Sequence, residues 1–233
     1  MNRINKIFWL WIVFALFACQ ATPASQPELT PTRTAGPTPT ASPPPTSTPP
    51  PTPVPVVRIE SGDRALFLGD YDQAREQYLA AFNDSTDRSV QAAALWGLGR
   101  TELEDERYQT AIDTLTRLAD EYPESTYAAR AHFLIGRAYF ELGQYRQSAD
   151  AYNAYLTRVP GVLDAYTQEY RGDALREAGN YTDAINAYTA ALTASRLDDG
   201  LTLRIKIAQS RFDFGDYAGA LSLFDEIFNS SAT

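Results

Sequence analysis

The chain of 233 residues is 44% hydrophobic and carries 29 acidic against 20 basic residues, giving a formal net charge of −9. This acidic surplus disfavours nucleic acids and anionic lipid surfaces as partners, because like charges repel each other. The sole cysteine is Cys19, so the chain can form neither an internal disulfide nor a cysteine-rich metal site.

Residues 1–18 have the pattern of a secretory signal peptide. Arg3 and Lys6 precede an uncharged, mostly apolar run over residues 7–18. The run is shorter than the roughly 20 residues that a membrane-spanning helix needs. Its length and its basic start are typical of a signal peptide, so the sequence predicts export from the cytoplasm.

The end of this run, Leu16-Phe17-Ala18-Cys19, resembles the bacterial lipobox. The resemblance implies that Cys19 is lipidated and becomes the mature N-terminus, attached to a membrane by its acyl chains. Phe17 is bulkier than the usual occupant of its position. Gln20 follows the cysteine, where an Asp would indicate retention at the inner membrane, so the outer membrane is favoured in a two-membrane bacterium. An ordinary signal peptide with an incidental Cys19 is the alternative.

Residues 19–57 comprise the predicted lipidated cysteine and a tether rich in Pro, Thr, Ser and Ala. Proline fixes φ and lacks a backbone donor, and few apolar groups are present to offset the entropy of ordering. The composition predicts a disordered, extended spacer of polyproline II character, on the order of 100 Å at full reach. A PxxP ligand and an O-glycosylated stalk are the functional alternatives.

A Gly-x-Tyr pattern recurs through residues 58–233. The tyrosines stand at positions 71, 108, 145, 181 and 217, and the second copy lacks the glycine. Spacings of 37, 37, 36 and 36 residues, with apolar residues at helical spacing between them, indicate five helical hairpins.

A small residue and a large one recur at matched offsets in these hairpins. Such pairs predict close packing of the two helices, because a glycine lets a large side chain approach the backbone. The pairs are Gly62/Tyr78, Gly99/Leu115, Gly136/Tyr152, Gly172/Tyr188 and Ala208/Phe224.

The Gly-x-Tyr turns and the pairs of small and large residues are shared with the tetratricopeptide repeat (TPR) family, which the chain therefore resembles. Together with the lipobox-like first nineteen residues, they make the chain similar to bacterial envelope lipoproteins that contain TPR repeats. The resemblance implies an all-α fold, a TPR-type α-solenoid with a right-handed superhelical twist. Arg58 and Ser61 replace apolar residues in the first repeat, so its first helix is expected to fray. The period is slightly longer than the family's usual one.

The last hairpin is expected to expose an apolar face, because no polar capping helix follows it. The expectation concerns Ile207, Phe212, Phe214, Leu223 and Phe228. Two explanations stay open: the chain is a fragment of a longer protein, or this end docks on a partner or on a second copy.

Little in the sequence indicates catalysis. His132 is the sole histidine and lies on a helix without a nucleophile or ligand cluster beside it. Glu124-Ser125 resembles the catalytic Glu-Ser of lytic transglycosylases, but an inter-repeat turn is the natural place for a helix cap. We therefore expect no enzymatic activity, no metal and no cofactor.

The resemblance implies that the first helices of the hairpins line a concave groove that binds a protein or peptide. Aromatic side chains and arginines suit peptide recognition, whereas packing between repeats and local ion pairs are the alternative role for the same residues. The predicted groove consists of Trp96, Arg100, Arg130, Phe133, Arg137, Tyr166, Glu169, Asp173 and Arg176.

The sequence thus predicts a lipid-anchored interaction scaffold outside the cytoplasm, held at the cell membrane or the outer membrane. The alternative is the N-terminal superhelical region of an envelope enzyme such as a lytic transglycosylase. An open reading frame that continues into a lysozyme-like domain would favour that alternative. The partner, the organism and the oligomeric state do not follow from the residues.

Overall fold

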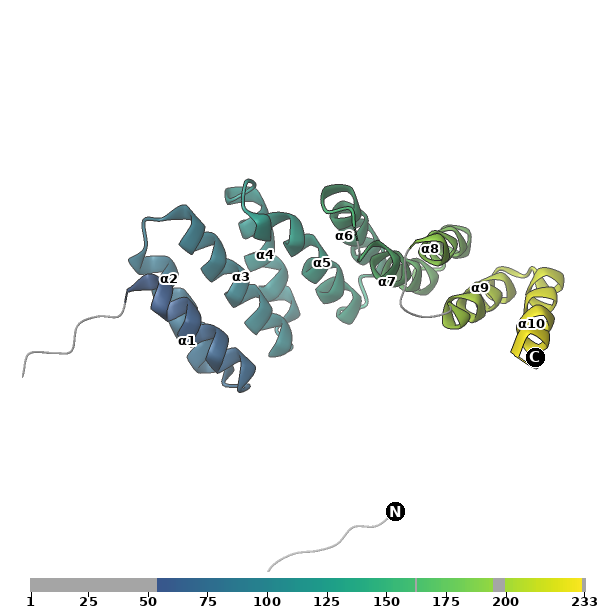
Figure 1. Cartoon of the computed structure of the whole chain (residues 1–233), viewed down its shortest axis with the longest axis horizontal. Coiled ribbons are helices and arrows are strands. Elements are labelled where there is room, and N and C mark those ends of the chain that lie inside the picture. Colours follow the sequence, from purple (N-terminus) through teal and green to yellow (C-terminus); the bar gives the residue numbers. More distant parts are fainter. Residues whose placement is uncertain (1–53, 162, 195–199, 232–233) are drawn as a thin grey trace, which may run out of the picture. The chain divides into compact units, whose positions relative to one another are not determined.

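The computed structural model describes residues 54–161, 163–194 and 200–231, and within these ranges every regular element is an α-helix (Figure 1). This confirms the predicted all-α fold. None of the described helices combines the length and the apolar character that crossing a bilayer requires. The predicted signal peptide, Cys19 and the tether as far as residue 53 lie outside the described residues. The helices are α1 (Pro55–Phe67), α2 (Tyr71–Asp84), α3 (Arg88–Glu104), α4 (Tyr108–Glu121), α5 (Thr126–Glu141), α6 (Tyr145–Arg158), α7 (Asp164–Glu177), α8 (Tyr181–Thr193), α9 (Leu201–Phe214) and α10 (Tyr217–Ser231).

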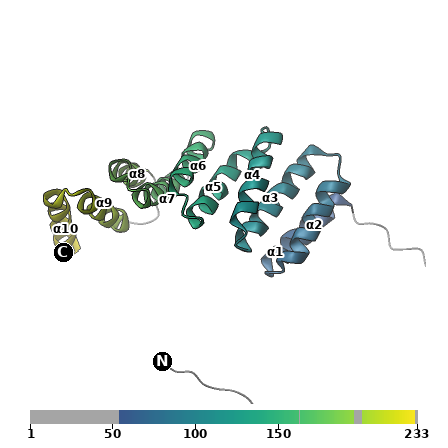
Figure 2. The same cartoon turned by 180° about the vertical axis from the view of Figure 1, so that it is seen from behind.

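Each helix packs on the next one in the sequence, and the pairs α1/α2, α3/α4, α5/α6, α7/α8 and α9/α10 are the five predicted hairpins (Figures 1 and 2). The first helix α3 also contacts the first helices α1 and α5 of the neighbouring hairpins. The buried apolar clusters are formed by these helices among themselves. The repeat region therefore contains a core of its own.

The five turns within the hairpins share one backbone geometry. In each, the residue before the tyrosine donates its N–H to the carbonyl five residues back, for example from Gln144 to Tyr139 over 2.9 Å. This bond closes the end of a helix around a residue of positive φ, a conformation that glycine adopts without steric cost. Gly143 has a φ of 70°, and Glu106 holds the same position in the second repeat with a φ of 58°. The recurring glycine thus serves the positive φ that this turn needs, rather than a contact of a side chain.

In four of the five predicted pairs, the small residue of the first helix lies against the large side chain of the second helix. A Cβ added at Gly136 would stand 2.9 Å from the ring of Tyr152, and one at Gly172 would stand 2.5 Å from the ring of Tyr188. The corresponding distance from Gly99 to Leu115 is 2.5 Å. At distances this short, a larger residue would force the facing side chain or helix to shift, so the glycines allow the close separation of the two helices in a hairpin.

The first hairpin accommodates its polar residues in local bonds. The guanidinium of Arg58 makes an ion pair with Asp84 at 3.2 Å, and the Ser61 hydroxyl donates to the Val57 carbonyl over 2.8 Å. Helix α1 is continuous from Pro55, where a proline in the first turn is favourable because that N–H has no helical partner.

The last hairpin exposes part of the apolar face that the sequence predicts. Phe212 and Phe214 are 56% and 61% exposed. The prediction was wrong for Ile207, which is buried beside Tyr188, and for Leu223, which packs against the same cluster. These two residues are covered because α8 and α10 pack on α9 from both sides.

Candidate binding surface

Two neighbouring cavities open beside α5 and share one side chain, Phe133. The first, of about 390 Å³, is lined by Trp96, Arg130 and Phe133, with Tyr155 and the loop that precedes α7. The second, of about 330 Å³, is lined by Phe133, Arg137, Phe140, Glu141, Tyr152, Tyr170 and Asp173. The structure thus brings five of the nine predicted groove residues together around Phe133. We call the lining of both cavities the aromatic surface.

Phe133 is the centre of an aromatic cluster. Its ring meets those of Tyr152 and Tyr155 edge-on, with centroids 5.5 Å away in each case, and that of Tyr170 at 5.8 Å. Tyr152 and Tyr170 are stacked at 5.9 Å. Edge-to-face and offset-stacked pairs at these distances are favourable beyond the area that they bury. The cluster is therefore fixed in shape before any ligand arrives.

The tyrosines of the cluster differ in their exposure to solvent. Tyr152 and Tyr155 are buried, and burial raises the pKa of both hydroxyls, so both stay neutral at physiological pH. Tyr170 is 47% exposed. A firmly held aromatic ring with an open face is a common anchor for a bound peptide.

Arg130 and Arg137 place positive charge at the two cavities. Arg130 is exposed and makes no ion pair within 4.0 Å with any residue that the structure describes. The Arg137 guanidinium donates to the Glu104 carboxylate over 3.1 Å, which links α5 to α3. Arg130 is thus the cation that can receive a carboxylate without breaking an existing pair.

Asp173 and Glu169 belong to a polar network between repeats as well as to the predicted groove. The ammonium of Lys206, on α9, donates to Asp173 over 2.8 Å and to Glu169 over 2.9 Å. The Tyr188 hydroxyl donates to Asp173 over 2.8 Å. The first hairpin has the same arrangement, in which Tyr78 donates to Asp63, the ion-pair partner of Arg100 at 3.5 Å. The network joins successive first helices.

The remaining predicted residues lie outside the two cavities. Arg176 pairs with Asp213 at 3.0 Å and so connects α7 to α9, and Arg100 connects α3 to α1. Tyr166 is half-buried on α7. Local pairing, the alternative role, therefore describes Arg100 and Arg176 better than ligand binding does.

Sequence reasoning missed Tyr170, the most exposed ring of the aromatic surface. Trp96 and Phe133 both stand three residues before the small residue of their helix, and that register points to Glu169 in the fourth repeat. The ring instead comes one residue later. The spacing of 37 residues from Phe133, the period of the early repeats, is the signal that could have found it.

The isolated polar candidates have structural roles. The Ser125 hydroxyl accepts the backbone N–H of Tyr127 over 3.2 Å, which makes Ser125 the predicted cap of α5. His132 is half-buried, and burial together with the nearby Arg158 guanidinium lowers its pKa. Among the described residues, no three His, Cys, Asp or Glu side chains are grouped as metal ligands would be.

The tetratricopeptide repeat family model matches residues 59–126, 127–162 and 170–231, which is more than half of the chain. The chain belongs to the tetratricopeptide repeat family. Its fold is similar to that of the MamA protein, with a TM-score of 0.63 and 18% identity over 75% of this chain and 90% of MamA. Residues 41 to the end of MamA from Desulfovibrio magneticus RS-1 give a TM-score of 0.63 and 15% identity, over 75% of this chain and 93% of that one.

This TPR chain is therefore built as its sequence predicts, as a series of helical hairpins of the kind that serves as a protein-interaction scaffold. Proteins of this fold are generally non-enzymatic scaffolds.

Proposed function

We propose that this TPR protein is an extracytoplasmic scaffold, lipid-anchored in a bacterial envelope, that binds a partner protein through the aromatic surface. The observation that carries the binding role is the cluster around Phe133, which pairs an exposed ring with an unpaired arginine beside two cavities. The lipobox-like residues before Cys19 motivate the anchor, and the proline-rich tether would let the repeats work away from the membrane.

The partner segment that best suits this surface is an extended or helical peptide with an apolar side chain next to an acidic one. The apolar group would fill the cavity beside Phe133 and Tyr170. The carboxylate would meet Arg130, whose planar guanidinium can donate two hydrogen bonds to it in a bidentate pair.

The binding role can be tested by site-specific photocrosslinking in the native envelope. A photoreactive phenylalanine analogue at Tyr170 should give one discrete adduct with a partner protein. The same analogue at Asp113, an exposed residue on α4, serves as the matched control. Equal adducts from both positions, or none from Tyr170, would refute binding at the aromatic surface.

Substitutions that test affinity should be made at exposed residues, because Phe133 also contributes to the stability of the fold. Its contacts with three tyrosines mean that Phe133→Ala removes packing as well as a ligand contact. The double variant Tyr170→Ala/Arg130→Ala, without the photoreactive residue, should lose binding of the captured partner protein in a pull-down, while its melting temperature stays close to that of the parent protein.

The anchor is tested separately by fractionation. A Cys19→Ser variant should leave the membrane fraction and lose the label from a radioactive fatty acid. A variant that stayed membrane-bound and labelled would overturn the lipid anchor and leave the binding role untouched.

A further inference from the structure

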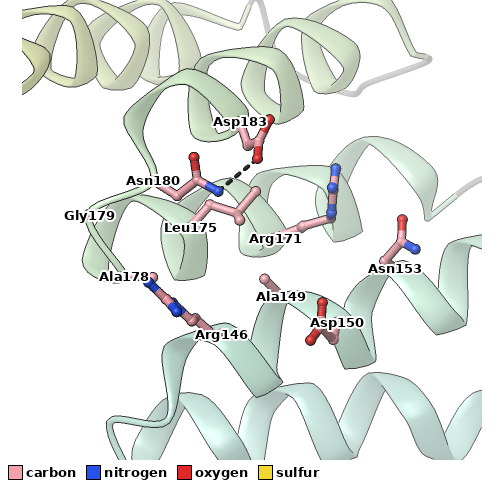
Figure 3. A pocket seen from close by; sticks show the side chains of 10 residues that line it. All are labelled: Arg146, Ala149, Asp150, Asn153, Arg171, Leu175, Ala178, Gly179, Asn180 and Asp183. Atoms are coloured by element: carbon pink, nitrogen blue, oxygen red, sulfur yellow. Dashed lines mark hydrogen bonds between the residues drawn. The ribbon is translucent and has the colours of Figure 1, made fainter.

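A polar cavity of about 540 Å³, which shares no lining residue with the aromatic surface, lies between α6 and α8 and beside α7 (Figure 3). Arg146, Asp150 and Asn153 enter its lining from α6, whereas Asn180 and Asp183 come from the turn before α8 and from its first residues. Figure 3 shows these side chains on either side of Arg171 and Leu175, which α7 contributes. The volume is in the range of small-molecule sites, about 300–1,000 Å³.

Arg171 breaks the pattern of the repeats. In every repeat after the first, the residue directly before the small residue of the first helix faces the preceding hairpin. In the second, third and fifth repeats this residue is apolar and packs against that hairpin: Leu98, Ile135 and Ile207. Ile135 and Ile207 are buried at this position. The fourth repeat has an arginine there, so the junction between α6 and α7 forms a charged cavity where the other junctions have apolar packing.

The Arg171 guanidinium is poorly satisfied. Its Nε atom is buried and has no hydrogen-bond partner among the described residues, and its Nη1 reaches only the Gln168 side chain at 3.5 Å. Arg58 and Glu102 also have a buried atom without a hydrogen bond, but both belong to ion pairs. A buried donor that lacks an acceptor is costly, and in a native structure it calls for an explanation. A bound acceptor would supply one.

The other charges around the cavity are equally available. Arg146, Asp150 and Asp183 are exposed, and none of them makes an ion pair within 4.0 Å with a described residue. The Asp183 carboxylate accepts one hydrogen bond, from the Asn180 amide over 2.7 Å. The lining therefore offers two positive and two negative groups. A simple anion would be repelled by the aspartates and a simple cation by the arginines.

We propose that this cavity binds a zwitterionic ligand, a free amino acid or a short peptide. Its carboxylate lies on Arg171, with Arg146 at the entrance, and its ammonium group lies against Asp150 and Asp183. The site is independent of the aromatic surface, and each proposal can fail without the other.

The test is a titration of the ¹⁵N-labelled repeat region, residues 54–233, followed by amide chemical shifts. The ligands are alanine and alanyl-alanine, with acetate and methylammonium as probes that carry one charge each. Both zwitterions should give saturable shifts confined to residues 146–153 and 171–183, and the single-charge probes should bind at least tenfold more weakly. A higher affinity for the dipeptide identifies a peptide ligand, and a higher affinity for alanine identifies a free amino acid.

The decisive variant is Arg171→Ile, because isoleucine occupies the same position in two other repeats. It should fold at least as stably as the parent protein and bind the zwitterions at least tenfold more weakly. Arg158→Leu, at an exposed arginine of α6 outside the cavity, should bind them as the parent does. The proposal is overturned by an absence of saturable shifts, by acetate binding as tightly as alanine, or by unchanged affinity in a folded Arg171→Ile variant.

Discussion

The ring of Tyr78 lies directly on the backbone of Gly97, so that a Cβ at Gly97 would stand 2.2 Å from its Cε1 atom. Gly62 approaches the same ring, at 2.7 Å to Cε1. One tyrosine of the first hairpin is therefore held between its own first helix and the first helix of the next repeat. This contact shows how a hairpin is closed and how two hairpins are joined by the same side chain.

Gly97→Ala is expected to destabilise the repeat region by about 1–3 kcal/mol, the usual cost of overpacking a filled core. Alanine favours a helix over glycine, but that gain is smaller than the clash. Urea unfolding of residues 54–233 measures the loss. The double variant Gly97→Ala/Tyr78→Leu should lose less than the sum of its single changes, because the smaller side chain relieves the contact. Strict additivity would contradict the role given to this pair.

Glu106→Gly is expected to stabilise the protein by up to about 1 kcal/mol. A left-handed backbone costs an L-residue about 1–2 kcal/mol, and the substitution by glycine removes this cost. Part of the resulting stabilisation is lost again, because glycine loses more conformational entropy on folding than glutamate does. Gly143→Ala, at the same turn position of the next repeat, should shift the urea midpoint in the opposite direction. Its Cβ would meet nothing within 4 Å, so that loss reports the backbone alone. Equal shifts of the same sign would refute the argument.

Lys206→Met should destabilise the repeat region by about 1–3 kcal/mol, because it removes a charged donor that Glu169 and Asp173 share. Burial works to lower the pKa of Lys206, but its hydrogen bonds to Asp173 and Glu169 outweigh that effect and raise it, so the side chain stays charged. Lys206→Arg keeps the charge and should recover part of the stability. A melting temperature unchanged in Lys206→Met would show that the network contributes nothing.

The stability of the protein should fall as the pH drops below about 6.5, and His132 should account for part of this loss. Burial, helped by the Arg158 guanidinium, holds the pKa of His132 below its ordinary value of 6.5. The folded state thus resists protonation that the unfolded chain accepts. The contribution of neutral His132 to the free energy of unfolding is complete above the pKa that His132 has in the unfolded chain. It is lost as the pH falls through the lower pKa that His132 has in the folded protein.

Melting temperatures of the parent protein and of His132→Gln between pH 7.5 and 5.5 test this expectation. His132 is the only histidine, so the variant should lose less stability over that range than the parent does. A difference between the two proteins that stays constant with pH would exclude the contribution.

The sequence by itself determined the repeat architecture of this protein. The tyrosine spacing located all five hairpins, and the small and large residues at matched offsets predicted contacts such as that of Gly136 with Tyr152. Such features can be read from the sequence because each repeat packs mainly on its own hairpin and on its neighbours. A periodic pattern therefore carries most of the information about the contacts.

Only the tertiary structure decided which polar and aromatic residues are free to bind. Arg100, Arg130 and Arg176 look equivalent in the sequence, yet two of them pair with aspartates on neighbouring first helices and Arg130 does not. Tyr170 and Arg171 likewise acquire their roles from side chains on other helices. The physical reason is that ion pairing and burial depend on distances between helices, which a one-dimensional period does not contain.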